Sequence, residues 1–263
     1  MSKLPSGEYH SRGTKRMNIV QPKFSSPWVG NQLFIYAFAR AYAEKYNLEF
    51  HCEDWPGNRM FQLNDLPYVH NLPMRHDVEL EKWDGESNIS IGGYAQRQPC
   101  LLYSGADARR FFQFRPEIQA LLDRVQLHDM CAHLRHGDYL GVPGFVAIKP
   151  ESYCKACDDF GFNPDDLHFV CQESPNVIPE LTEMGLGQLP DFYVLMKARI
   201  LFRANSTFSW WAATLGNAER IFSPNVQGIP GSDGVLRDAP FEEGNHCNFT
   251  NHCWFTSTLF LKE

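Results

Sequence analysis

The sequence predicts an α/β protein that is built on parallel β-sheets. Short apolar runs typical of strands alternate with segments of helical periodicity, and the turns between them carry glycine, serine or asparagine. Alternation of this kind is typical of βαβ units, whose consecutive strands lie parallel. The chain has 263 residues, of which 43% are hydrophobic and 21% charged. This size and composition suit a soluble globular protein with one large α/β unit or two lobes.

The first half of the chain begins with one clear strand–turn–helix unit. Residues 17–22 predict a strand, and residues 32–46 predict a helix in which apolar side chains recur with a period of 3.6. The next strand is expected at residues 48–51. Between residues 55 and 98, prolines and glycines interrupt the pattern, so we expect loops and short strands there.

A second helical pattern lies within residues 111–125, and its helix is expected to begin near Arg115-Pro116, because proline is tolerated in the first turn. We place the boundary between two lobes there. The second half alternates more regularly. Strands are expected at residues 130–134, 167–171, 200–203 and 220–223, and helices at residues 151–160, 190–198 and 207–215. We therefore divide the chain into a flexible leader (1–16), a first lobe (17–125) and a second lobe (126–263).

The net charge and the absence of long apolar runs argue against a nucleic-acid-binding or membrane protein. Asp and Glu outnumber Lys and Arg by 31 to 24, and the net charge of −7 argues against a nucleic-acid partner or an anionic membrane surface. The first sixteen residues contain no apolar run that could serve as a signal peptide. No window approaches the roughly 18 uninterrupted apolar residues of a membrane-spanning helix. We therefore expect a soluble cytoplasmic protein without stable membrane insertion.

The eight cysteines are compatible with free thiols in a reducing compartment. Cys154 and Cys157 form a CxxC motif, and His–Cys pairs occur at residues 246–247 and 252–253. None of these has a second motif at a spacing that is usual for zinc. We therefore predict that no metal is bound.

The turn after the strand at 130–134 carries several polar groups at the carboxyl end of an apolar run. Arg135 offers a fork of N–H donors that suits phosphate oxygens, and Gly137 allows a sharp bend. His133 lies on the same side of the extended strand as Arg135, and Asp138 can cap or tie the loop. The alternative is a surface turn in which Arg135 pairs with Asp138.

The run from Asn205 to Trp211 follows another strand in the same way. Its Asn-Ser-Thr triplet is suited to cap the next helix, whose first amides and positive dipole end would attract an anion. The alternative is plain capping, with Trp210 and Trp211 in the core. Ligands collect at the carboxyl ends of strands in open α/β sheets, so both turns together predict a phosphate-bearing ligand.

A third turn, Gly30-Asn31-Gln32, places side-chain amides where a cleft between two lobes would open. With it, the segments 29–37, 92–96, 133–139 and 191–211 resemble, in order, the signature segments of the α-1,2-fucosyltransferases of glycosyltransferase family 11. The resemblance extends over residues 17–225.

This resemblance implies a GT-B-like fold, in which two Rossmann-like lobes with parallel sheets face a central cleft. The first lobe would hold a glycan acceptor, and the second would hold GDP-fucose without a metal. The reaction would be inverting transfer of fucose to a glycan hydroxyl, namely O-2 of galactose. Arg135 would neutralise the β-phosphate of the departing GDP, and Asn31 would approach from the opposite lobe. The expected donor-binding residues are Gly30, Gln32, His136, Gly137, Glu173, Asn205, Ser206, Thr207, Phe208 and Ser209.

The chain departs from the family pattern at three places. His136 replaces a second arginine, Gln172-Glu173-Ser174 replaces Ser-Asp-Asp, and Ser26-Pro27-Trp28 replaces a glycine-rich start. Glu173 is expected to take over the contact with guanine or ribose. Two alternatives therefore stay open: transfer from another nucleotide sugar, and a catalytically inactive sugar-nucleotide-binding protein.

The acceptor hydroxyl needs a base or a hydrogen-bond acceptor during its attack. The sequence offers four candidates for this role, namely Asp138, His133, Asp54 and Asp65.

Overall fold

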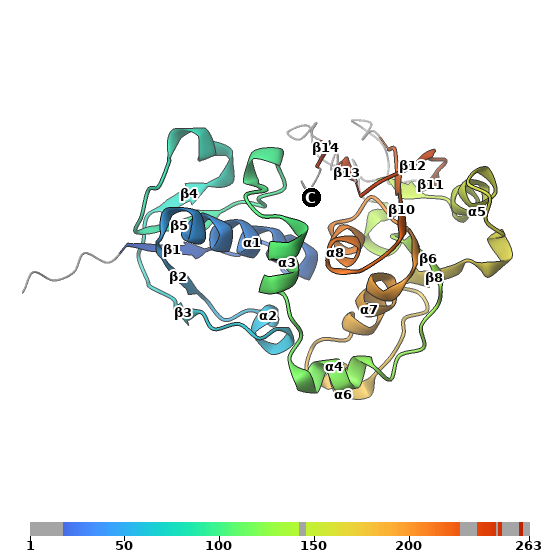
Figure 1. Cartoon of the computed structure of the whole chain (residues 1–263), viewed down its shortest axis with the longest axis horizontal. Coiled ribbons are helices and arrows are strands. Elements are labelled where there is room, and N and C mark those ends of the chain that lie inside the picture. The colour runs from blue at the N-terminus through green and yellow to red at the C-terminus, as the bar shows by residue number, and fades with distance from the viewer. Residues whose placement is uncertain (1–17, 142–145, 227–235, 246, 249–257, 260–263) are drawn as a thin grey trace, which may run out of the picture.

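The computed structural model describes residues 18–141, 146–226, 236–245, 247–248 and 258–259, and it contains two large sheets (Figure 1). The first sheet has the order β3-β2-β1-β5-β4, and all its neighbouring strands are parallel. Its strands are β1 (Ile19–Pro22), β2 (Glu49–Cys52), β3 (Leu66–Pro67), β4 (Met74–His76) and β5 (Ile89–Gly92).

The second sheet has the order β12-β10-β9-β6-β8, in which only β12 runs antiparallel to its neighbour within the described residues. Its strands are β6 (Met130–Leu134), β8 (His168–Cys171), β9 (Ile200–Phe202), β10 (Arg220–Pro224) and β12 (Phe241–Glu243). The chain leaves β6 for β8 on one side and then crosses to β9 on the other. The carboxyl end of β6 is therefore the switch point at which open α/β sheets bind ligands.

Two pairs of short strands complete the β structure. The pairs are β7 (Ala147–Ile148) with β11 (Leu236–Arg237), and β13 (Cys247–Asn248) with β14 (Thr258–Leu259). The α-helices are α1 (Val29–Tyr46), α2 (Pro56–Met60), α3 (Gly105–Phe111), α4 (Pro116–Leu122), α5 (Pro150–Asp159), α6 (Pro179–Glu183), α7 (Leu189–Lys197) and α8 (Thr207–Leu215). None of the described helices is both long and apolar enough to cross a lipid bilayer.

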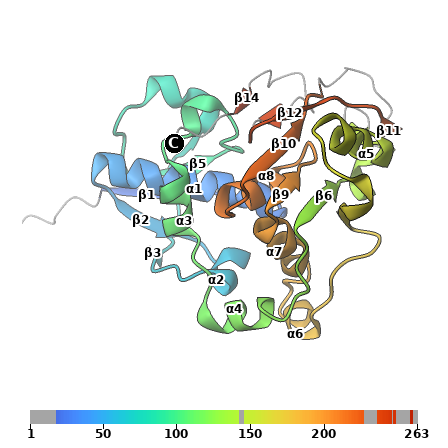
Figure 2. The same ribbon diagram turned by 45° about the vertical axis from the view of Figure 1, so that its right-hand side comes forward.

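The halves built on the two sheets are called the first and second lobes below. One hydrophobic core cluster draws on both lobes, and a separate cluster lies within the second lobe. Helices α1 and α8 lie side by side between the sheets in Figures 1 and 2. Phe34 of α1 packs against Trp210 and Trp211 of α8, with ring centroids 4.6 and 5.0 Å apart. Twelve of the eighteen α1 residues are buried. The buried surface of the helix is therefore wider than the single apolar stripe that its sequence predicts.

The helix that the sequence predicts to begin near Arg115-Pro116 is α4, which begins at Pro116 and ends at Leu122. Helix α3 was not predicted, and a turn at residues 112–115 separates it from α4. Arg115 precedes Pro116 and adopts an extended conformation with ψ 144°, as the residue before a proline usually does. Phe114 forms an isolated bridge with Phe61, which fixes the turn between the two helices.

Candidate active site

A cavity of about 710 Å³ opens between the two lobes. Its second-lobe wall is formed by residues at the carboxyl ends of β6, β8 and β9. Its first-lobe wall is formed by residues 25–31, Pro56 and Tyr94. The first turns of α1, α7 and α8 all contribute lining residues. The first turns of α1 and α8 hold no acidic residue, whereas that of α7 holds Asp191. Two positive helix ends therefore meet at one cavity, an arrangement that favours an anionic ligand.

The two polar turns that the sequence singles out are neighbours in this cavity. Strands β6 and β9 pair in parallel, so that their carboxyl ends lie together. The hydroxyl of Tyr139 donates to the backbone carbonyl of Asn205 at 3.0 Å, across 66 residues of sequence. The β6 turn and the start of α8 thus form one polar surface.

The start of α8 has the capping geometry that its sequence predicts. The Ser206 hydroxyl accepts a hydrogen bond from the Phe208 amide at 3.3 Å, and no acidic residue lies in the first turn. Ser206, Thr207 and Phe208 all line the cavity. The dipole at this helix end therefore remains available to an external anion.

Gly30 brings the start of α1 against the start of α8. A Cβ atom at Gly30 would lie 2.5 Å from Thr207 Oγ1 and 3.0 Å from the Phe208 amide nitrogen. Only a residue without a side chain allows this close approach. Gly30 and Asn31 both line the cavity, so the glycine acts by joining the two helix ends.

Asn31 uses its side-chain amide to tie three segments together. Its Oδ1 accepts from Gln96 Nε2 at 2.9 Å and from Thr207 Oγ1 at 3.1 Å, and its Nδ2 donates to Ser26 Oγ at 3.0 Å. The contact with Thr207 crosses between the lobes. This geometry gives Asn31 a positioning role at the cavity.

Arg135 lines the cavity and lies near two aromatic rings. The centre of its guanidinium is 5.6 Å from the Trp28 ring and 5.2 Å from the Tyr139 ring. Cation–π contacts at these distances help to hold the guanidinium at the cavity wall. The group is therefore positioned for an anion such as a diphosphate.

His133 lines the same cavity but is 95% buried. Burial lowers its pKa to about 3, assisted by the charges of Arg135, Arg203 and His136. Its Nδ1 has no hydrogen-bond partner among the described residues. A neutral imidazole with so low a pKa is a weak base, so the geometry favours a hydrogen-bonding role over proton abstraction.

Several predicted donor-binding residues serve the local structure instead, and lie outside the set of described residues that line the cavity. The His136 ring bonds the Ile148 carbonyl through Nε2 at 2.9 Å, and Gln32 donates to the Ser26 carbonyl at 3.0 Å. Ser209 is fully buried, with its hydroxyl bonded to the carbonyls of Ala204 and Ser206.

Other predicted residues lie beside the cavity wall. Gly137 packs so closely against Gln172 that a Cβ atom there would overlap the Gln172 side chain. Glu173 is exposed and lies away from the cavity, and Gln172 lines it instead. Asn205 contributes the carbonyl bonded by Tyr139 and is otherwise buried. The side chain of Asp138 lies outside the described part of the structure.

Several residues that line the cavity were not predicted as site residues from the sequence. Asp191, in the first turn of α7, lines the cavity and accepts two hydrogen bonds from Asn176 at 2.8 and 2.9 Å. Burial raises its pKa. Trp28, Tyr94 and Gln188 also line the cavity. Asp191 and Tyr94 lie within the family-like segments, which was the available signal for them.

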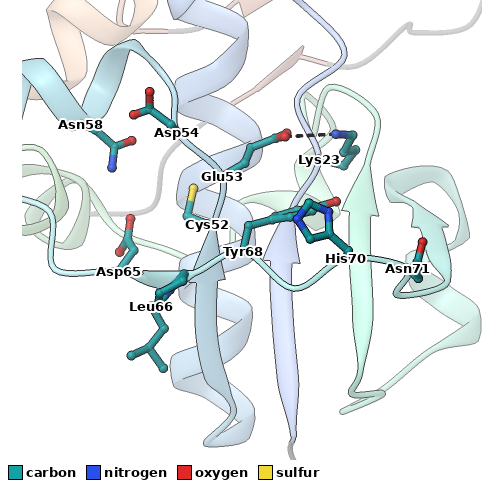
Figure 3. Close-up of a pocket in the computed structure, with 11 residues that line it drawn as sticks. Lys23, Cys52, Glu53, Asp54, Asn58, Asp65, Leu66, Tyr68, His70 and Asn71 are labelled. Carbon is teal, nitrogen blue, oxygen red and sulfur yellow. Dashed lines mark hydrogen bonds and ion pairs between the residues drawn. The ribbon is translucent and has the colours of Figure 1, made fainter.

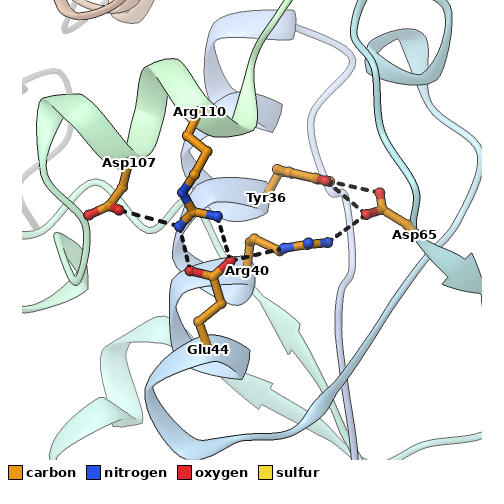
Figure 4. Close-up of polar contacts among 6 residues, drawn as sticks. All are labelled: Tyr36, Arg40, Glu44, Asp65, Asp107 and Arg110. Carbon is orange, nitrogen blue, oxygen red and sulfur yellow. Dashed lines mark hydrogen bonds and ion pairs between the residues drawn. The ribbon is translucent and has the colours of Figure 1, made fainter.

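Asp54 and Asp65, two of the candidate bases, line a second cavity of about 680 Å³ on the first lobe (Figure 3). Both Asp65 oxygens accept from the Tyr36 hydroxyl, at 2.9 and 3.0 Å, and Oδ1 also accepts from Arg40 at 3.0 Å (Figure 4). The Asp65 side chain is 3% exposed, and burial raises its pKa. Both oxygens of Asp65 therefore already accept hydrogen bonds within the protein, whereas Asp54 is exposed.

The comparisons with known proteins bear on the fold. No protein-family model and no curated protein matches the chain. Among solved structures, the fucosyltransferase NodZ from Bradyrhizobium matches with a TM-score of 0.53 and 15% identity, over 80% of this chain and 96% of that chain. The NodZ α-1,6-fucosyltransferase co-crystallised with GDP matches with a TM-score of 0.51 and 16% identity, over 79% and 95%.

The fold is that of the GT-B fucosyltransferases. The predicted GT-B-like fold is thereby confirmed, and the 710 Å³ cavity lies between the two lobes of this fold. No group of three or more His, Cys, Asp or Glu side chains in the described residues could hold a metal ion. Cys154 and Cys157 on α5 are free thiols, and residues 246, 252 and 253 lie outside the described residues.

Proposed function

We propose that this protein is a fucosyltransferase that takes its sugar from GDP-fucose and transfers it to a glycan hydroxyl with inversion. The observation that carries this proposal is the convergence of Arg135 and the N-termini of α1 and α8 on one cavity at the β6 switch point. Such a site suits the two phosphates of a nucleotide sugar. The likeness of the fold to GDP-binding fucosyltransferases supports the choice of donor.

In the proposed reaction, the acceptor oxygen attacks C1 of fucose while the bond from C1 to the β-phosphate oxygen breaks. Negative charge then grows on the departing GDP. Arg135 and the α8 end, with the Ser206 and Thr207 hydroxyls, would meet that charge in a preorganised arrangement, where such groups are most effective. These groups would act without a divalent cation.

The proton of the acceptor hydroxyl must pass to a base or to water. The low pKa of His133 argues against it as this base. The hydrogen bonds from Tyr36 and Arg40 to Asp65 argue against Asp65 in the same role. Of the four candidates, Asp54 and Asp138 remain as proposals. We also propose O-2 of galactose as the accepting position, on the family resemblance of the sequence.

Titration calorimetry of the full chain with GDP, GDP-fucose, GDP-mannose and UDP, with and without EDTA, tests the donor. We expect GDP and GDP-fucose to bind with similar affinity in both conditions, and UDP to bind more weakly. Tighter binding of UDP, or loss of GDP binding in EDTA, would contradict the proposal. Binding of GDP-fucose without transfer to galactosides or to chitobiose would instead indicate an inactive sugar-nucleotide-binding protein.

A further inference from the structure

Two exposed aromatic rings face the 710 Å³ cavity from the first lobe. Trp28 is 55% exposed and Tyr94 is 44% exposed, and both line the cavity. Large aromatic side chains usually bury most of their surface. Two exposed rings in one concave site therefore mark a surface for a ligand with an apolar face.

The loop that carries Tyr94 is held in an uncommon conformation. Gly93 and Ala95, on either side of Tyr94, have φ angles of 105° and 52°. The buried carboxylate of Asp77 accepts a hydrogen bond from the Ala95 amide at 2.8 Å, and Gln96 bonds Asn31. Backbone strain of this kind persists where the surroundings fix it, and it clusters at binding sites. The loop thus fixes where Tyr94 faces the cavity.

Trp28 lies next to the proposed reacting centre. It precedes α1, and its ring is 5.6 Å from the guanidinium of Arg135. The nucleotide base would find its polar partners across the cavity on the second lobe, where Gln172, Gln188 and Asp191 line the wall. A first-lobe aromatic surface beside Arg135 is therefore better placed for the acceptor than for the guanine.

The second cavity lies close to this aromatic surface. Pro56 lines the first cavity and Asn58 lines the second, both on α2. Polar side chains suited to sugar hydroxyls line the second cavity (Figure 3). Its ionisable lining residues are Glu53, Asp54, Asp65, Lys23, Cys52, Tyr68 and His70. Lys23 pairs with Glu53 and Arg40 pairs with Asp65, each at 3.0 Å. Asp54 is the lining carboxylate outside these two ion pairs, and its negative charge disfavours an anionic sugar.

We infer that the acceptor is an uncharged oligosaccharide whose terminal sugar stacks on Trp28 and Tyr94 and whose next sugar enters the second cavity. This inference rests on the proposed fucosyltransferase function. The C–H face of a pyranose ring buries apolar surface against the two aromatic rings. The substrate class is therefore neutral glycans of at least two sugars.

Saturation-transfer NMR and calorimetry on the full chain, with no donor present, test this inference directly. The probes are lactose, N-acetyllactosamine and chitobiose, with 3′-sialyllactose as the anionic counterpart. We expect at least one neutral disaccharide to bind. Trp28→Ala and Tyr94→Ala should each weaken that binding about tenfold, as expected for losing about 60 Å² of apolar contact.

The control variant is Leu127→Ala, because Leu127 is similarly exposed (51%) and lies outside both cavities. It should bind the disaccharide as the wild type does, and all variants should keep the circular dichroism of the wild type. Unchanged sugar binding in both aromatic variants would overturn the inference. Equal binding of 3′-sialyllactose and lactose would also overturn it.

A parallel titration with GDP separates this inference from the proposed function. Tyr94→Ala should bind GDP as the wild type does, because the cation–π partners of Arg135 are Trp28 and Tyr139. Weaker GDP binding with unchanged sugar binding in Tyr94→Ala would assign the Tyr94 ring to the donor and overturn the inference. If the wild type binds no GDP but binds the disaccharide through Trp28, the donor proposal fails and the sugar surface stands.

Discussion

Thr207 donates its hydroxyl hydrogen to Oδ1 of Asn31 at 3.1 Å, and this bond joins the first turns of two helices from different lobes. The two residues are 176 positions apart in the sequence. Both line the cavity between the lobes. The bond therefore couples the relative position of the lobes to the shape of the proposed donor site.

A double-mutant cycle with Asn31→Ala and Thr207→Val should reveal this coupling. A single hydrogen bond typically contributes about 0.5–1.5 kcal/mol, and removing both partners should therefore cost less than the sum of the single losses by roughly that amount. Urea unfolding of the four proteins measures the free energies. Strict additivity would show that the bond contributes nothing to stability.

Gly30→Ala should destabilise the protein, because the new Cβ would collide with the hydroxyl and backbone of the α8 start. Overpacking of this kind typically costs roughly 1–3 kcal/mol. The matched control is Gly105→Ala at the start of α3, where the nearest atom is Arg109 Nη1 at 3.4 Å, on a flexible side chain. Thermal unfolding should show a lower midpoint for Gly30→Ala alone; equal midpoints would refute the close packing.

Arg135→Ala should reduce fucosyl transfer by roughly two to three orders of magnitude, because the lost donors act on charge that develops as GDP departs. Arg135→Lys should restore little, since an ammonium group cannot make a bidentate contact. The measurement is kcat at saturating acceptor. Arg124→Ala serves as the control, because Arg124 pairs with Glu180 on the surface. Wild-type turnover in Arg135→Ala would remove this residue from the mechanism.

His133 should make folding stability depend on pH. The folded protein binds a proton at His133 only near pH 3, whereas the ordinary pKa of the side chain is 6.5. Unfolding therefore takes up a proton between these values, and stability should fall as the pH falls from about 6.5 to about 3. Urea unfolding of the wild type and of His133→Asn at pH 7, 5.5 and 4.5 should give a smaller loss for the variant.

The exposed His70 supplies the comparison for this pH series. His70→Asn should follow the wild-type pH dependence, because this substitution removes an exposed ring and leaves His133 in place. Parallel curves for the wild type and His133→Asn would contradict the assignment of a neutral, buried imidazole at position 133.

The local parts of the site were predictable because short-range rules decide them. The strand at residues 130–134 and the helix at 207–215 have the bounds that their sequence predicts, since an apolar run and a Ser-Thr cap act within a few residues. The start of α4 at Pro116 was predicted for the same reason, since proline suits the first turn of a helix. Helix α3 was missed, and the extended residue before Pro116 and the contact of Phe114 with Phe61 separate it from α4.

The sequence by itself determined the parallel α/β architecture and the two polar turns that follow β6 and β9, because strand and helix periodicity and capping are local properties of the chain. Tertiary structure alone decided which side chains of these turns line the cavity. It turned His136 toward the Ile148 carbonyl, placed Gln172 rather than Glu173 at the cavity wall, and lowered the pKa of His133. Burial, close approach and charge depend on groups far apart in the sequence, and they are fixed only when the lobes pack together.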